Sequence, residues 1–216
     1  MVLSRRYTLG EEIAHAITHG LGVGLSIAAT VLLAVAAARH GDTWCVVAGG
    51  VFGGTLILLY TASTMYHALP WNAAKRVFQK LDHAAIYVLI AGTYTPFTLV
   101  TLRGGWGWSL FGVVWGLAIL GATLDLVLRR RRRWLSLTFY LSMGWLVAVA
   151  IRPLVRELPS PGLLLLLLGG LAYTGGVAFY VARRWRYHHA VWHVCVLAGS
   201  ILHFFAVYFY VLPRPA

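Results

Sequence analysis

The chain has 216 residues, of which 60% are hydrophobic and 11% are charged, whereas a typical soluble domain carries about 25% charged residues. Its 18 lysines and arginines outnumber its 6 acidic residues, and they lie in short gaps between long apolar runs. This pattern excludes a soluble basic domain that binds nucleic acid, and it indicates an integral membrane protein.

Seven apolar segments are each long enough to cross a hydrocarbon core of about 30 Å. The predicted spans are residues 13–38, 44–66, 83–102, 106–127, 134–151, 162–182 and 190–212. The runs are continuously apolar rather than alternating, which excludes a β-barrel and predicts an all-α bundle of seven transmembrane helices. Glycine patterns such as "GGVFGG" at 49–54 are interpreted as helix packing. Without repeats or linkers, residues 1–216 are expected to form a single domain.

The basic residues are distributed unevenly between the two sets of loops. With the N-terminus in the cytoplasm, the inner segments hold thirteen lysines and arginines and the outer segments hold five. Because these residues resist translocation when they lie in short loops, the sequence predicts a cytoplasmic N-terminus. The run of arginines at 129–133 is interpreted as a topology anchor, with a site for anionic headgroups as the alternative.

The first span carries ionisable residues at its inner end, where such groups are costly and are therefore functional candidates. Glu11 and Glu12 are expected at the membrane interface, with contact to a functional site as the alternative. His15 and His19 lie one helical turn apart, so geometry alone permits a metal site on this helix.

The second and third spans place further polar residues at the same predicted depth. Ser63 and His67 lie one turn apart at the inner end of the second span. Asp82 and His83 open the third span from the same side. All of these groups gather near the cytoplasmic face, although the orientation was derived from lysine and arginine alone.

The stretch "HHAVWHVC" at 188–195 leads into the last span and contains three of the four histidines at 188, 189, 193 and 203. His189 and His193 are four residues apart and can converge on one ion, as the histidines of HExxH helices do. His188 points about 100° away from them. His203 lies about 15 Å deeper than His193, which is too far to share that ion.

A third ligand must come from another helix at the same depth, and His67 is the natural choice. Three imidazoles with one open position are typical of catalytic zinc, whose bound water has a pKa near 7. Asp82 could accept a proton from that water, or bind the metal through it. Ser63 suits a hydrogen bond that supports the site. The sequence therefore predicts a Zn²⁺ site with His67, His189 and His193 as ligands.

Four segments resemble the hemolysin III family, the bacterial branch of the progestin and adipoQ receptor superfamily. They are "GEEIAHAITHGLG" at 10–22, "STMYH" at 63–67, "KLDHAAIYVLIAGTYTP" at 80–96 and "HAVWHVCVLAGSILHFF" at 189–205. The resemblance implies seven helices with a cytoplasmic N-terminus, zinc on His67, His189 and His193, and an aspartate, Asp82, that acts through water.

The same resemblance argues against His15 and His19 as ligands. Receptors of the superfamily carry an aromatic residue where this chain has His83, which could add a base or an extra ligand. Packing or an interfacial place is the simpler expectation for that side chain.

The resemblance also implies a function. The superfamily is grouped with membrane hydrolases of lipid amide bonds, which predicts a zinc-dependent, ceramide-like hydrolase in membrane-lipid homeostasis. A lipid or free fatty acid would lie between the helices, and the metal site would face the cytoplasm at a bacterial inner membrane. The alternative is a non-enzymatic sensor or receptor-like protein with a structural zinc. A pore-forming cytolysin ranks last because the outer halves of the spans are apolar.

Overall fold

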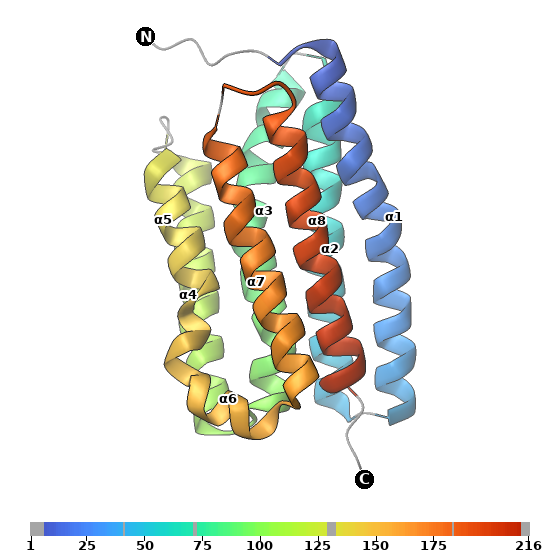
Figure 1. The fold of residues 1–216 in the computed structure, drawn as a ribbon, viewed down its shortest axis with the longest axis vertical. Helices are drawn as coiled ribbons and strands as arrows, with labels where there is room; N and C mark the ends of the chain where they lie inside the picture. Colours follow the sequence, from blue (N-terminus) through green and yellow to red (C-terminus); the bar gives the residue numbers. More distant parts are fainter. Residues whose placement is uncertain (1–6, 41, 71–72, 129–132, 183, 213–216) are drawn as a thin grey trace.

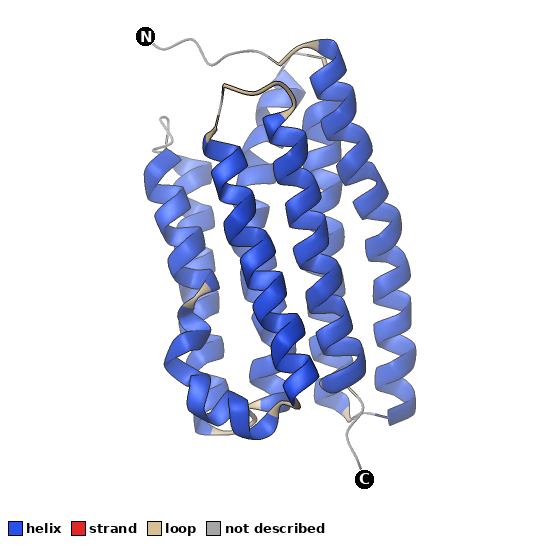
Figure 2. Ribbon diagram, viewed as in Figure 1, coloured by secondary structure: helices blue, strands red, loops and turns tan. Residues whose placement is uncertain are grey.

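The computed structural model describes residues 7–40, 42–70, 73–128, 133–182 and 184–212. Within these ranges the chain is helical and contains no strand (Figure 2). The α-helices are α1 (Leu9–His40), α2 (Thr43–Ala68), α3 (Ala73–Pro96), α4 (Gly105–Val127), α5 (Arg133–Gly144), α6 (Ile151–Glu157), α7 (Ser160–Val181) and α8 (His188–Tyr210). A π-helical turn, Phe97–Thr101, follows α3, and a 3₁₀ turn, Leu146–Ala150, joins α5 to α6.

Seven helical segments are long and apolar enough to cross a membrane, which confirms the predicted bundle. The third span combines α3 with the π turn, and the fifth combines α5, the 3₁₀ turn and α6. Large apolar side chains point outward from the bundle, among them Ile17, Leu21 and Ile119, which are 58%, 63% and 64% exposed. Such a surface suits hydrocarbon, so the protein is a multi-pass membrane protein in contact with lipids.

Charged residues of the described segments gather at the two ends of the bundle. Helices α1, α3, α5 and α8 all begin at the end where α2 finishes (Figure 1). We call it the α1-start end. Its described basic residues are Lys75, Arg76, Lys80, Arg133, Arg184 and Arg186. Other residues used in the charge count, namely Arg5, Arg6, Arg129 to Arg132, Arg183 and Arg214, lie outside the described residues.

The third span begins at Ala73, ten residues before its predicted start at residue 83. Its first turns contain several polar residues, so their mean hydropathy is low, and the search for long apolar runs did not include them. Their charges nevertheless have partners in the structure. Lys75 Nζ lies 2.9 Å from Glu12 Oε1, and Lys80 Nζ donates to the Leu126 carbonyl at 2.8 Å. These contacts let a charged segment continue the helix.

The fifth span continues to Glu157 instead of ending at residue 151, and it is broken in the middle. Proline at 153 is tolerated because it lies in the first turn of α6, where backbone N–H groups need no helical acceptor. At the break, the Tyr94 hydroxyl lies 2.9 and 2.8 Å from the carbonyls of Met143 and Gly144, and it accepts from the Val147 N–H at 2.9 Å. One side chain of α3 therefore satisfies backbone groups that would otherwise be unpaired in the membrane.

Glycines bring α1 and α2 close together. A Cβ added at Gly53 would meet Thr30 Cγ2 at 2.8 Å, whereas one added at Gly54 would meet nothing within 4 Å. The Thr30 hydroxyl donates to the Ser26 carbonyl at 2.7 Å, which fixes the side chain against α2. Gly53 therefore lies in the interface between α1 and α2, whereas Gly54 faces open space. The position of Gly53 agrees with the interpretation of these glycines as helix packing.

Candidate metal centre

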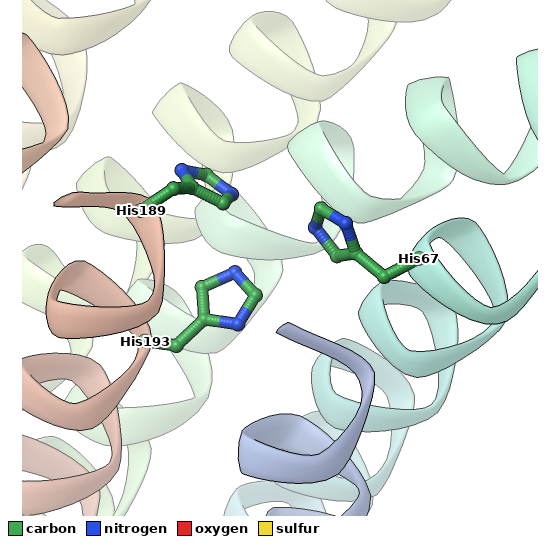
Figure 3. A group of neighbouring side chains, drawn as sticks. All are labelled: His67, His189 and His193. Carbon is green, nitrogen blue, oxygen red and sulfur yellow. The ribbon is translucent and has the colours of Figure 1, made fainter. Parts of the chain in front are cut away.

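Three histidines from two distant helices meet near the α1-start end (Figure 3). His67 lies in the last turn of α2, and His189 and His193 lie in successive turns at the start of α8. All three are buried, and one ligand nitrogen from each lies within 4.8 Å of the others. This group could hold a metal ion, because neutral imidazole nitrogens are common ligands of zinc and related metals.

A carboxylate from α1 orients the first of these rings. His67 Nδ1 lies 2.7 Å from Glu12 Oε2, and the other oxygen, Oε1, lies 2.9 Å from Lys75 Nζ. Beside a carboxylate and an ammonium, His67 Nδ1 carries the proton and donates it to Glu12. The lone pair is then on Nε2, which is buried and has no hydrogen-bond partner within the described ranges. Carboxylate–histidine pairs of this kind support metal ligands in proteins.

The backbone of α1 orients His193 in a similar way. His193 Nδ1 lies 3.3 Å from the His15 carbonyl and 3.2 Å from Thr18 Oγ1. A carbonyl oxygen can only accept, so Nδ1 carries the proton and Nε2 keeps the lone pair. In His189 the buried Nδ1 has no hydrogen-bond partner among the residues described.

These unpartnered nitrogens are a test of whether a metal fits. Buried polar atoms in folded proteins are almost always hydrogen-bonded, so several unsatisfied nitrogens at one place need an explanation. His67 Nε2 and His189 Nδ1 are both in this position and belong to the same group of three. A cation with a preference for nitrogen would satisfy both. The residues present therefore fit the metal that the sequence predicts.

The predicted supporting residues lie close to the group. Ser63 is completely buried one turn before His67, and its hydroxyl has no hydrogen-bond partner in the described part of the chain. Asp82, on α3, is 7% exposed and lines the same cavity as His189 and His193. The structure thus brings both residues to the site region, Asp82 from a third helix.

The first helix contributes more than the sequence suggested. The His15 ring centroid lies 4.6 Å from that of His67 and 4.8 Å from that of His189, and the His19 ring stacks on His193 at 3.6 Å. A second candidate group for a metal consists of Glu12, His15 and His67, which again lie within 4.8 Å of one another. The sequence signal for His15 was its spacing of one helical turn from His19, which belongs to no candidate metal group of the described residues.

The two adjacent acidic residues of α1 have different partners. Glu11 accepts from the Thr8 amide and hydroxyl, both at 2.9 Å, and from the Tyr187 amide at 3.4 Å. Glu12 instead contacts His67, as described above. Of the two residues expected at the interface, Glu12 therefore supports the histidine group, which agrees with the alternative that the sequence left open for it.

Two other histidines lie near the group without joining it. His188 Nδ1 donates to the Phe179 carbonyl at 3.0 Å, which occupies its ring with α7. His83 lines the cavity next to Asp82, and its carbonyl accepts from the Tyr140 hydroxyl at 2.9 Å. Neither belongs to a candidate metal group of the described residues.

A cavity of about 130 Å³ extends from the histidine group toward the middle of the bundle. It lies between α3, α5, α7 and α8, and most of its lining is aliphatic or aromatic. Polar residues occur at both ends, with Asp82, His189 and His193 at one and Tyr173 and His203 at the other. A pocket with an apolar body and a few polar groups is typical of sites for small or lipid-like molecules.

Comparisons with known proteins agree over almost the whole chain. A family profile described as "Haemolysin-III related" matches residues 7–204. The chain is 48% identical over 203 residues to Hemolysin-3 of Bacillus cereus, covering 94% of this chain and 93% of that protein. It is 46% identical over 209 residues to the Hemolysin-3 homolog of Bacillus subtilis (strain 168), covering 97% and 98%.

A more distant similarity extends to animals. The chain is 26% identical over 214 residues to the human monocyte to macrophage differentiation factor, covering 96% of this chain and 87% of that protein.

Proposed function

The chain belongs to the hemolysin III family of membrane proteins, and from this premise we propose that it is a zinc-dependent hydrolase of lipid amide bonds. The observation that carries the proposal is the convergence of His67, His189 and His193 beside an apolar cavity within the membrane-spanning bundle. A metal site that is open to water could act on many soluble substrates. The histidine group instead borders an apolar cavity that suits an acyl chain.

His67, His189 and His193 would hold the ion. Bound there, zinc would supply a water with a pKa near 7 and would polarise the carbonyl of an amide. Glu12 holds His67 in the tautomer that leaves Nε2 available. Asp82, at the cavity wall, would take the proton of the attacking water and return it to the leaving amine. The Ser63 hydroxyl, without a partner among the described residues, would donate a hydrogen bond at the site.

The cavity supports a lipid substrate. Its apolar lining between α3, α5, α7 and α8 would hold an acyl chain, with the amide at the histidine end. The products would be a free fatty acid and an amine, as expected of a ceramide-like substrate. Such turnover would act in membrane-lipid homeostasis.

The placement of the site in the cell follows from the basic residues. Those that the structure describes at the α1-start end, near the histidine group, favour the cytoplasmic side. In a bacterium the protein would then lie in the inner membrane, with the metal near its cytoplasmic face.

A structural zinc is the second candidate. The histidines come from α2 and α8, and Glu12 of α1 is bonded to one of them, so an ion would tie the ends of three helices together. In that case the metal would raise thermal stability without turnover, as in a sensor or receptor-like protein.

The test is fatty acid release from a defined substrate. We would reconstitute the zinc-loaded protein in vesicles that contain an N-acyl sphingoid lipid and measure free fatty acid by mass spectrometry. Release should be lost on chelation and in His67→Ala, and should fall at least about 100-fold in Asp82→Asn. His188→Ala is the matched control, since its Nδ1 is bonded to the Phe179 carbonyl of α7 and it belongs to no candidate metal group of the described residues.

Turnover that survives His67→Ala would refute the assignment of the ligands. Zinc binding that raises the melting temperature, with no fatty acid released, would establish the structural alternative instead.

A further inference from the structure

The end of the cavity that lies away from the candidate metal group carries two stacked rings. Tyr173 of α7 and His203 of α8 both line the cavity, and their ring centroids are 5.3 Å apart with the planes 14° from parallel. His203 follows His193 by ten residues on the same helix, so this end lies about 15 Å from the histidine group. Both rings belong to membrane-spanning helices, where unpaired polar atoms are costly.

Two glycines hold these rings in place. A Cβ added at Gly169 of α7 would collide with the His203 ring, and one added at Gly199 of α8 would meet Tyr173 Cε1 at 2.7 Å. Each glycine lies one turn before the ring of its own helix, so each ring packs on the glycine of the opposite helix. A larger residue at either glycine would displace a ring from its place at the cavity.

His203 supplies a hydrogen-bond acceptor at this end of the cavity. Its Nδ1 lies 2.7 Å from the Gly199 carbonyl, and a carbonyl oxygen can only accept, so Nδ1 carries the proton and Nε2 keeps the lone pair. The bond to Gly199 is the only hydrogen bond of the ring among the described residues. The residue is 5% exposed, so Nε2 is an acceptor that lacks a donor in a nearly buried place.

Tyr173 supplies a hydrogen-bond donor beside it. The Tyr60 hydroxyl donates to Ser200 Oγ at 2.7 Å, and Ser200 Oγ lies 2.9 Å from the Tyr173 hydroxyl. Ser200 has one proton to give, and within the described ranges the Tyr173 oxygen is the acceptor that it reaches. The donors therefore run from Tyr60 through Ser200 to Tyr173, and the proton of Tyr173 remains available to a ligand.

The other hydroxyl groups of the cavity lining already have acceptors in the protein. The hydroxyls of Thr93 and Thr174 each donate to a backbone carbonyl of their own helix at 2.8 Å. The Tyr94 hydroxyl is bonded to the backbone at the break of the fifth span. In the part of the chain that the structure describes, the far end of the cavity thus offers a ligand one acceptor, on His203, and one donor, on Tyr173.

We propose that Tyr173 and His203 bind a hydroxyl group carried partway along an acyl chain, so that the cavity selects hydroxylated lipids. A hydroxyl group donates one hydrogen bond and also accepts, so it would donate to His203 Nε2 and accept from Tyr173. A carbonyl can only accept and would leave Nε2 unpaired, and a plain methylene chain would leave both groups unpaired. This inference rests on the proposed function only in that the cavity takes an acyl chain with its polar end at the histidine group.

A water molecule is the competing occupant. Water has two protons, and a buried water is typically held by about three hydrogen bonds. Tyr173 and His203 offer one donor and one acceptor, so a water between them would keep one proton unpaired. The hydroxyl group of a lipid has one proton and matches the pair.

The distance between the two ends of the cavity determines which hydroxyl group is selected. Carbon–carbon bonds of about 1.5 Å at tetrahedral angles advance an extended chain by about 1.3 Å per carbon, so about 15 Å corresponds to about twelve carbons. The selected hydroxyl therefore lies near the middle of the acyl chain and not beside the amide. Ricinoleic acid carries a hydroxyl at about this position, and oleic acid has the same chain without it.

The test compares these two fatty acids as ligands of the purified full chain supplied with Zn²⁺. Binding would be measured in detergent micelles by competition with a fluorescent fatty acid. Ricinoleate should bind at least about 10-fold more tightly than oleate, because it satisfies two polar groups that oleate leaves unpaired. Tyr173→Phe and His203→Phe keep a ring at each position and should each remove most of this preference. Thr93→Val is the control, since its hydroxyl is bonded within α3, and it should keep the preference.

Equal affinities for ricinoleate and oleate in the parent protein would overturn the inference in favour of water, while leaving the proposed hydrolase intact. A preference that persists in both ring variants would also overturn it, because the hydroxyl would then be held elsewhere. Binding of neither fatty acid would overturn it together with the acyl-chain role of the cavity. Tyr173→Phe decides the question if His203→Phe does not fold, and the comparison in the parent protein needs no variant.

Discussion

At the scale of single residues, the most informative contact is the hydrogen bond between His67 and Glu12. It joins α2 to α1, determines which nitrogen of His67 is available and places a negative charge beside a candidate cation site. Lys75 balances that charge from α3. The Glu12 side chain is 19% exposed, and a partly buried carboxylate is costly unless it is paired, so its contacts with His67 and Lys75 hold the imidazole in one orientation.

Replacing Glu12 should therefore weaken metal binding without removing a ligand. In Glu12→Gln the charge of the acceptor is lost and His67 is no longer fixed in its tautomer. We expect the affinity for zinc to fall about 10–100-fold, measured by competition with a chromophoric chelator.

Glu11→Gln is the matched control, because Glu11 bonds to Thr8 and the Tyr187 amide instead. An unchanged affinity in Glu12→Gln, or an equal loss in both variants, would contradict the role of this carboxylate.

The sequence could predict part of this site for a simple reason. Residues four apart on one helix share a face, so the sequence could place His189 and His193 together, and a common depth pointed to His67; the structure brings the three side chains together. Glu12 and His15 face these residues across a helix interface, and the angle between two helices is not encoded in either helix alone. Their contacts depend on how closely α1 packs on α2.

At the scale of helices, that packing depends on which glycines lie in the interface. Gly53 faces Thr30 of α1, and Gly54, the next residue, faces open space. Glycine lets transmembrane backbones approach closely, and the approach of α1 brings Glu12 and His15 to the candidate metal group.

An alanine scan of this glycine pair tests the interface. Gly53→Ala would push Thr30 away from its hydrogen bond to Ser26 and separate the helices. We expect the free energy of unfolding to fall by about 1–3 kcal/mol, measured by reversible unfolding in mixed micelles.

Gly54→Ala should change the free energy of unfolding by less than about 0.5 kcal/mol, or raise it, because alanine is the better helix former. If both variants lower the free energy of unfolding by the same amount, the effect comes from α2 itself, and the role of Gly53 in the contact with α1 is contradicted.

The sequence predicted the number and order of the helices better than their ends. Hydropathy finds the apolar centre of a span, whereas an end depends on partners for its charges. Lys80 extends α3 because the Leu126 carbonyl accepts from it, and Pro153 does not end the fifth span because it falls in a first turn. Neither the Leu126 carbonyl as the partner of Lys80 nor the position of Pro153 in a first turn could be deduced from hydropathy.

At the scale of the whole molecule, the remaining question is orientation. The basic residues described at the α1-start end predict that this end faces the cytoplasm. Single cysteines can report it in a chain that lacks Cys45 and Cys195. Gly105 begins α4 in open space at the end of the bundle opposite the α1-start end, and Trp185, 63% exposed, lies between α7 and α8 at the α1-start end.

In right-side-out vesicles, a membrane-impermeant maleimide should label Gly105→Cys and should label Trp185→Cys only after lysis. Inside-out vesicles should give the reverse. Labelling of Trp185→Cys alone in sealed right-side-out vesicles would invert the topology and place the histidine group at the outer face.

The histidine group also constrains how the protein is made. About 120 residues separate His67 from His189, so at about 5–20 residues per second a ribosome needs on the order of ten seconds to supply the second half of the group. During that interval Glu12, His67 and Lys75 can already pair in the nascent chain, since all three precede the later helices. If the group binds a metal as proposed, the ion can be held by all three histidines only after α8 has been made, and a translation product that stops before α8 leaves the ribosome without His189 and His193.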